Sequence, residues 1–145
     1  MAFLAVKRSF CAILVSRIVR KPHFQEGAET MANTRQEAWD LIKEYNKEPF
    51  HRQHALTVEG CMRYFAKSLG YGDEEEFWGL VGLLHDLDYE KYPEEHCRVE
   101  DKILRKKGWD EKLIHAVVSH GYPRCSDVAP ELEMEKVLYA VDELS

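Results

Sequence analysis

Apolar residues recur every three or four positions from about residue 34 onward, which is the spacing of one face of an α-helix. The stretch 58–69 shows the pattern clearly, with apolar residues at positions 58, 62, 65 and 69. The sequence shows neither the strict alternation of a β-strand nor an internal repeat. The predicted helical segments are about 34–46, 49–69, 73–86, 95–108, 110–121 and 130–142. We therefore predict an all-α fold, a single compact bundle of five to six helices.

Local signals mark where several of these helices begin and end. Thr34, followed three residues later by Glu37, is a capping-box pattern. Pro49 suits the first turn of the second helix, and Gly70 suits its C-terminal end. Asp110 is a favourable N-cap for the helix that follows it. These signals make the first, second and fifth helices the best defined.

Charge divides the chain into two parts. The 145 residues are 45% hydrophobic, which is enough for one globular domain. Residues 1–30 contain five basic and two acidic residues, a net charge of +3. Because the whole chain has a net charge of −6, the remaining residues carry a net charge of −9. We predict a helical domain over 31–145 and a basic leader over 1–30. The leader is either a misassigned start, with Met31 the true first residue, or a flexible or targeting segment.

Composition also narrows the class of function. A net charge of −6 argues against binding to nucleic-acid polymers. No apolar run reaches the ~18 residues that a transmembrane helix needs, so we expect no membrane partner and a cytoplasmic protein. Four separate cysteines without a CxxC pair argue against a zinc finger or a thioredoxin-like site. We expect all four to be ordinary reduced thiols.

Polar residues lie on, or at the end of, the apolar faces of separate predicted helices. A single inward histidine is usually a hydrogen-bonded core residue, but burying several titratable groups is costly unless something pairs with them. A metal cation is a common partner, and imidazole with carboxylate suits Mn, Fe, Co, Ni, Zn or Mg. His115 lies off these faces and is predicted to point outward. The candidate ligands are His54, His85, Asp86, His96, His120 and Asp142.

The ordered series His54, His85-Asp86 and Asp142 resembles the HD superfamily of metal-dependent phosphohydrolases. The resemblance covers roughly residues 34–145, and the part from His85 to Gly121 is similar to small stand-alone bacterial HD-domain proteins. It implies that His54, His85, Asp86 and Asp142 hold one metal ion. In binuclear members two further histidines bind a second ion. His96 and His120 stand at the corresponding places and would either hold that ion or contact the phosphate.

The chain departs from the family pattern at two points. Many members read His-Asp-Ile-Gly-Lys, whereas Asp88 and Tyr89 stand here at the last two of these positions, so the lysine is missing. Family members also commonly continue beyond the point where this chain stops, three residues after Asp142, which leaves open a truncated last helix. The candidate replacements for the lysine as phosphate contacts are Arg52, Lys91 and Arg124.

The resemblance implies hydrolysis of a phosphate ester by metal-activated water, with one or two divalent ions as cofactor. The catalytic candidates are His85, Asp86 and Asp88, of which Asp88 would orient a ligand histidine, act as a base or cap a turn. The expected substrate is a nucleotide or another small phosphorylated molecule. Two alternatives stay open. One is a di-iron oxygenase on the same scaffold, and the other is a non-catalytic metal-binding or regulatory module.

Overall fold

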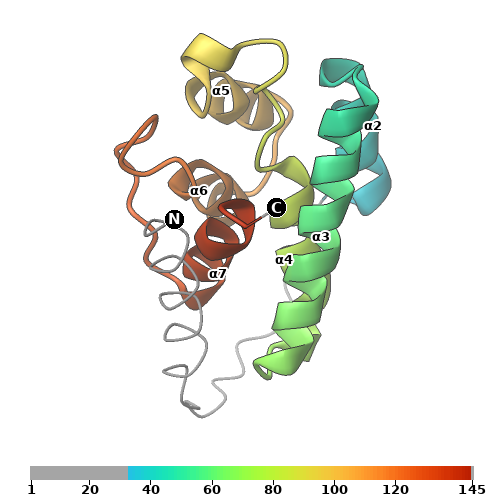
Figure 1. Cartoon of the computed structure of the whole chain (residues 1–145), viewed down its shortest axis with the longest axis vertical. Helices are drawn as coiled ribbons and strands as arrows, with labels where there is room; N and C mark the ends of the chain where they lie inside the picture. Colours follow the sequence, from blue (N-terminus) through green and yellow to red (C-terminus); the bar gives the residue numbers. More distant parts are fainter. Residues whose placement is uncertain (1–32, 145) are drawn as a thin grey trace, which may run out of the picture.

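The computed structural model describes residues 33–144, and in this part of the chain it contains six α-helices, two short 3-10 helices and no strand (Figure 1). The predicted all-α fold is confirmed, whereas the predicted leader, residues 1–30, lies outside the described residues. Over the described part, no helix is both long and apolar enough to cross a membrane. The elements are α2 (Arg35–Tyr45), α3 (Pro49–Ser68), η1 (Gly72–Glu74), α4 (Glu75–Leu84), η2 (Pro93–Glu95), α5 (Arg98–Lys106), α6 (Glu111–Ser119) and α7 (Glu133–Asp142).

The strongest cap signals lie where the sequence predicts them. Thr34 and Glu37 form the complete capping box of α2, with the Thr34 backbone N–H donating to the Glu37 carboxylate at 2.6 Å. Pro49 is the first residue of α3, and Gly70 after its end has φ +88, a left-handed conformation that suits glycine. Asp110 caps α6 by accepting hydrogen bonds from two backbone N–H groups. Short-range chemistry therefore fixes these ends.

The helix predicted to begin at residue 95 begins later. Pro93–Glu95 forms the 3-10 helix η2, and α5 starts only at Arg98. Between them, Cys97 has φ 69, a left-handed conformation that cannot continue a right-handed helix. The prediction that His96 lies on the face of this helix is therefore wrong, because His96 precedes the helix.

The last helix also begins later than predicted, at Glu133 instead of Pro130. The carboxylate of Glu135 accepts hydrogen bonds from the backbone N–H groups of Glu131 and Leu132, at 2.6 and 2.9 Å. A side chain that turns back in this way satisfies the backbone N–H groups of the N-cap residue and of the residue before it. Glu135 is fully buried, so this contact fixes the start of α7 within the core.

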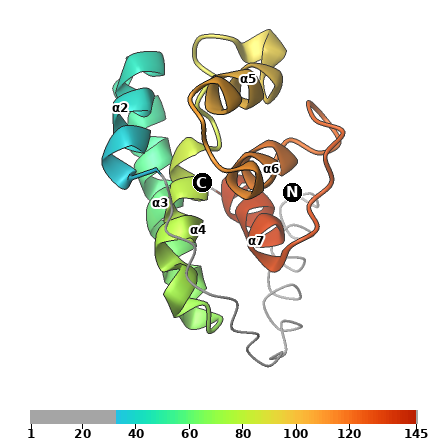
Figure 2. The same ribbon diagram turned by 180° about the vertical axis from the view of Figure 1, so that it is seen from behind.

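Helix α4 is the centre of the fold. Every residue from Trp78 to Leu84 is buried, so its last two turns are enclosed on all sides. Helix α3 packs along it, and α2 and α6 also pack against it (Figures 1 and 2). Gly82 permits the close approach of α3, because a Cβ atom there would lie 3.0 Å from the carbonyl oxygen of Val58.

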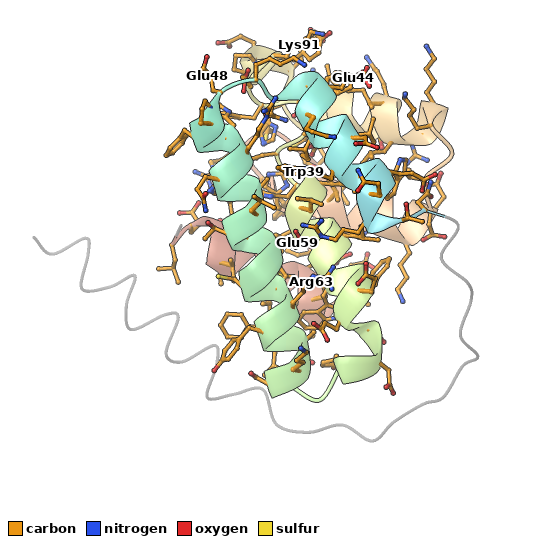
Figure 3. The ribbon with its side chains drawn as sticks, turned by 90° about the vertical axis from the view of Figure 1, so that its right-hand side faces the viewer. Trp39, Glu44, Glu48, Glu59, Arg63 and Lys91 are labelled. Carbon is orange, nitrogen blue, oxygen red and sulfur yellow. The ribbon has the colours of Figure 1, made fainter. Side chains whose placement is uncertain are left out.

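A network of ion pairs joins α2, α3 and α4. Glu59 on α3 binds Arg35 through two hydrogen bonds, at 2.6 and 2.8 Å, and accepts a third from Arg63 at 3.1 Å. Arg63 also donates to Glu76 on α4 at 2.8 Å. Figure 3 shows Glu59 and Arg63 on the face that α3 shares with its neighbours. We call these four residues the Glu59 network.

Candidate metal centre

The six candidate ligands come together in one cluster, although they lie on five separate segments of the chain. His54 lies on α3, His85 caps the end of α4, and Asp142 is the last residue of α7. Helix α7, which ends at Asp142, packs against α3 (Figure 1). Asp86 divides the cluster into a first ligand group, with His54, His85 and Asp142, and a second ligand group, with His96 and His120.

In the first ligand group one atom of each side chain points to a common centre. The Nε2 atoms of His54 and His85 lie 3.1 Å apart. Oδ2 of Asp86 lies 3.4 Å from each of these nitrogens. Oδ1 of Asp142 lies 3.3 Å from Nε2 of His54 and 3.2 Å from Nε2 of His85. Two nitrogens and two oxygens therefore surround one point and could hold a metal ion.

The second ligand group uses the other oxygen of the same aspartate. The Nε2 atoms of His96 and His120 lie 3.1 Å apart. Oδ1 of Asp86 lies 3.3 Å from Nε2 of His96 and 3.5 Å from that of His120. Asp86 thus presents one oxygen to each ligand group, which is the arrangement of a bridging carboxylate.

Backbone carbonyls fix the orientation of two of the imidazole rings. Nδ1 of His85 lies 2.8 Å from the carbonyl oxygen of Gly82, and Nδ1 of His120 lies 2.5 Å from that of Val117. A carbonyl oxygen only accepts, so each Nδ1 carries the proton. In the neutral rings each Nε2 then presents a lone pair to the cluster. This is how protein side chains commonly prepare histidine to bind a metal.

Asp88 fixes a third ring. Its Oδ1 accepts a hydrogen bond from Nδ1 of His96 at 2.6 Å, and its Oδ2 accepts one from the backbone N–H of Glu100 at 2.8 Å. Asp88 is fully buried, and each of its oxygens has a donor. The contact with His96 is that of a residue that orients a ligand histidine, and the contact with Glu100 satisfies an N–H group in the first turn of α5. Which of its three predicted roles Asp88 performs stays a prediction.

The second ligand group consequently contains three acceptors and no donor when its rings are neutral. Nε2 of His96 and of His120 each present a lone pair, and the carboxylate of Asp86 carries a negative charge. Such groups repel one another at 3.1–3.5 Å unless a cation lies between them. A metal with bonds of about 2.1 Å to each imidazole fits nitrogens at this separation.

The charges within the cluster also favour a bound cation. Hydrogen bonds to Asp142 and Asp86 raise the pKa of His54 to about 9. Burial lowers the pKa of His85, but the two carboxylates outweigh this effect and raise it to about 10. Burial opposes ionisation of Asp86 and Asp142, yet the neighbouring imidazoles hold the pKa of each well below its usual range. The carboxylates therefore stay ionised and attract positive charge.

The three basic residues proposed as phosphate contacts have different surroundings. Nε of Arg52 donates to the carbonyl oxygen of Asn46 at 2.7 Å, at the end of α2. The ammonium group of Lys91 lies 5.2 Å from the ring centre of Tyr45, and Figure 3 shows it at the end of the molecule. Arg124 donates to Glu143, the neighbour of the candidate ligand Asp142. Arg124 is thus the only one of the three with a described contact next to the cluster.

Sequence reasoning missed a row of aromatic rings beside the cluster. The ring centre of Tyr89 lies 5.2 Å from that of His96, and that of His51 lies 6.0 Å from Tyr89. Phe50 continues the row at 5.7 Å from His51. Phe50 and Tyr89 are 76% and 47% exposed. Their exposure depends on how the segment after α4 packs against α3, which periodicity does not reveal.

Two further polar residues differ from the expectations of the sequence. Glu100 on α5 is fully buried, and neither of its carboxylate oxygens has a hydrogen-bond partner. Burial, together with the nearby Asp88 and Asp86, raises its pKa well above the usual range. His115, predicted to point outward, is half-buried, with its Nδ1 2.7 Å from Oε1 of Glu135. His115 makes this contact outside the two ligand groups.

Comparison with family models, with curated proteins and with solved structures finds no match to the chain. The description of the candidate centre therefore stands on its own geometry. The described residues contain three groups that could hold a metal ion: His54, His85, Asp86 and Asp142; His96, Cys97 and His120; and Asp88, His96 and Glu100. Asp86 contacts both histidines of the second ligand group as well as those of the first.

Proposed function

We propose that the protein is an HD-type metal-dependent phosphohydrolase, which cleaves a phosphate ester of a nucleotide or another small molecule with metal-activated water. The observation that carries the proposal is the position of Asp86. Its Oδ2 faces the nitrogens of His54 and His85, and its Oδ1 faces those of His96 and His120, which have no proton to donate to it when their rings are neutral. Two ions joined by a carboxylate are a common arrangement for hydrolysis of phosphate esters.

In this proposal the first ligand group holds one divalent ion and the second holds another. Nitrogen and oxygen ligands suit Mn, Fe, Co, Ni, Zn or Mg. Bound ions of this kind lower the pKa of water toward about 7 and neutralise charge that develops on the phosphoryl oxygens. Asp88 keeps the ring of His96 in place by accepting its Nδ1 proton. Gly82 and Val117 do the same for the rings of His85 and His120 through their carbonyl oxygens.

The exposure of the ligands indicates the side from which a substrate approaches. The side chain of His85 is fully buried, whereas those of Asp86 and Asp142 are 26% and 25% exposed. Water and substrate would therefore reach the ions from the carboxylate side. Arg124, held next to Asp142 by Glu143, is the basic residue best placed to contact the phosphate group.

The aromatic row favours a substrate that carries a planar group. Tyr89 and Phe50 are exposed, and Tyr89 packs edge-on against the candidate ligand His96. Exposed rings of this kind stack on nucleobases or other aromatic groups, typically contributing about 1–3 kcal/mol for each base. This arrangement is the reason to test nucleotides before simple alkyl phosphates.

The experiment has two stages. Metal content is measured by mass spectrometry on protein purified without added metal, and nucleotides and other phosphate esters are then tested with Mn, Co, Ni and Mg. The proposal expects phosphate release that disappears in His85→Ala and Asp86→Ala and persists in His115→Gln, a control that keeps a donor for Glu135. Metal-loaded, folded protein that cleaves none of these esters would contradict the proposal.

A di-iron oxygenase is the second candidate, because four imidazoles and a bridging carboxylate are also suitable ligands for iron. Iron content and oxygen consumption distinguish it from the hydrolase. If the protein binds metal but neither releases phosphate nor consumes oxygen, the remaining reading is a non-catalytic metal-binding or regulatory module.

A further inference from the structure

Two cysteines lie almost in contact next to the second ligand group. The Sγ atoms of Cys97 and Cys125 are 3.0 Å apart. Both cysteines line a surface pocket of about 450 Å³, in which Cys97 is buried and Cys125 is half-buried. The two residues are separated by 28 positions, and the sequence predicts only ordinary reduced thiols at both. The fold, not local sequence, brings them together.

The backbone on both sides is shaped around this pair. Cys97 has φ 69 and is the only non-glycine residue with a positive φ in the described part of the chain. Such a conformation is unfavourable for a residue with a side chain and persists only where the surroundings impose it. At Gly121, a Cβ atom would lie 2.4 Å from the sulfur atoms of both Cys97 and Cys125. The left-handed conformation of Cys97 and the absence of a side chain at Gly121 thus both allow the two sulfur atoms to come close together.

The distance between the two sulfur atoms is close to that of a disulfide bond. A disulfide has a sulfur–sulfur distance of about 2.05 Å, so a movement of roughly 1 Å would bring the two sulfurs to that distance. The two thiols also differ in access. Both cysteines line the surface pocket, but Cys125 is half-buried whereas Cys97 is only 1% exposed, so a reagent in the pocket meets Cys125 first. This is the usual arrangement of an attacking thiol and a resolving thiol.

We propose that Cys97 and Cys125 form a reversible disulfide, with a small disulfide of the glutathione type as oxidant. The sulfur of Cys125 attacks one sulfur of the oxidant and releases one glutathione. The sulfur of Cys97 then attacks Cys125 in the mixed disulfide and releases the second glutathione. Two electrons pass from the protein to the oxidant, and the two thiol protons end on the two glutathione molecules.

The cross-link would join the two segments that carry the second ligand group. Cys97 directly follows His96, and the backbone N–H of Cys125 donates to the carbonyl oxygen of Gly121, the residue after His120. A disulfide here fixes the separation of these two segments, and the oxidised protein should therefore release its second metal ion to a chelator more slowly. This effect rests on the proposed metal centre, whereas formation of the disulfide does not.

The experiment uses the full chain in mixtures of reduced and oxidised glutathione. Samples are quenched with acid, their free thiols are alkylated, and cross-linked peptides are identified by mass spectrometry. We expect a peptide pair joined through Cys97 and Cys125, which disappears on addition of dithiothreitol. Cys61→Ser, which removes a half-buried cysteine outside the pair, should leave the cross-link unchanged.

Three results would overturn the inference in the wild-type protein, without reliance on a variant that fails to fold. These are a stable glutathione adduct on Cys125, free alkylation of both cysteines under oxidising conditions, or cross-links through Cys11 or Cys61 instead. Chelator release of the second ion is then measured in parallel. Equal release from reduced and oxidised protein would overturn the effect on the metal while leaving the disulfide established.

Discussion

Two clusters of buried polar groups in this protein differ in how their charges are balanced. In the Glu59 network, a carboxylate only 6% exposed receives three hydrogen bonds from Arg35 and Arg63. In the candidate metal centre, Asp86 faces the nitrogens of four histidines, three of which direct their Nδ1 protons elsewhere. The first cluster contains its own cations. The second contains no arginine or lysine, so its positive charge comes from protonated imidazoles or from a cation that binds from solution.

The difference separates a structural role from a functional one. A buried carboxylate is tolerated when a fixed partner neutralises it, and guanidinium groups do this well because they offer several donors in a plane. Imidazoles whose protons are held by carbonyl oxygens offer only lone pairs, and lone pairs stabilise a carboxylate only through an intervening cation. Buried charge alone therefore does not mark a functional site, whereas convergence of acceptors does.

The largest effect is expected at the centre of the unbalanced cluster. His85→Ala removes a fully buried ligand of the first group, so the first ion should be lost and phosphate release should fall to background. Metal content and activity are measured together on the same preparation. His115→Gln should leave both unchanged, since the pairing of His115 with Glu135 lies outside the two ligand groups. Full metal content in His85→Ala would contradict the assignment of a metal-binding role to this cluster.

Removal of metal should lower the melting temperature. An ion at a thousand times its dissociation constant stabilises the native state by about 4 kcal/mol, because it binds only the folded chain. Melting curves with and without EDTA measure the effect. The same comparison on His85→Ala should show a smaller shift. Coincident melting curves for the wild-type protein would mean that the charges of the cluster are neutralised without a metal ion.

Asp88→Asn tests the orientation of the second ligand group. An asparagine oxygen can accept only one of the two hydrogen bonds that Asp88 now receives, from His96 and from Glu100. Loss of such an orienting contact typically weakens metal affinity about 10–100-fold. Titration with metal should show weaker binding of the second ion and an unchanged first ion. Equal weakening of both would indicate a general loss of packing instead.

Glu59→Gln should have the smallest effect, about 1–2 kcal/mol of unfolding free energy, because Arg35 and Arg63 are partly exposed and regain water. Chemical denaturation measures this loss. Metal content should stay at the wild-type value, since the Glu59 network contains no candidate ligand. A fall in metal content together with stability would mean that the two clusters are not independent.

Features set by neighbouring residues could be predicted from the sequence. The capping box at Thr34, the proline at the start of α3 and the cap at Asp110 each depend on contacts within one turn. The all-α fold follows from hydrophobic spacing over the same segments. The start of α7 was missed, because it depends on a side chain four residues ahead whose capping role leaves no periodic signal.

The candidate site could be predicted from the sequence only in part. The six ligands could be proposed from inward-facing polar residues and from a family resemblance, but their distances depend on loops. His96 shows the limit, because it reaches the cluster from the segment between η2 and α5 and not from a helical face. The burial of Glu59 and Glu100 was equally hidden, since a glutamate on a helix is normally exposed.

The position of Asp142 has a consequence for the chain as a polymer. It is the last residue of α7, whereas His54 lies near the start of the domain on α3. An ion held by both would close a loop of roughly 90 residues, and by the chain-entropy argument used for disulfides a permanent link of that size is worth about 4–5 kcal/mol. A bound ion would thus act as a removable cross-link, and adding or withdrawing it would change the connectivity of the folded chain without breaking a covalent bond.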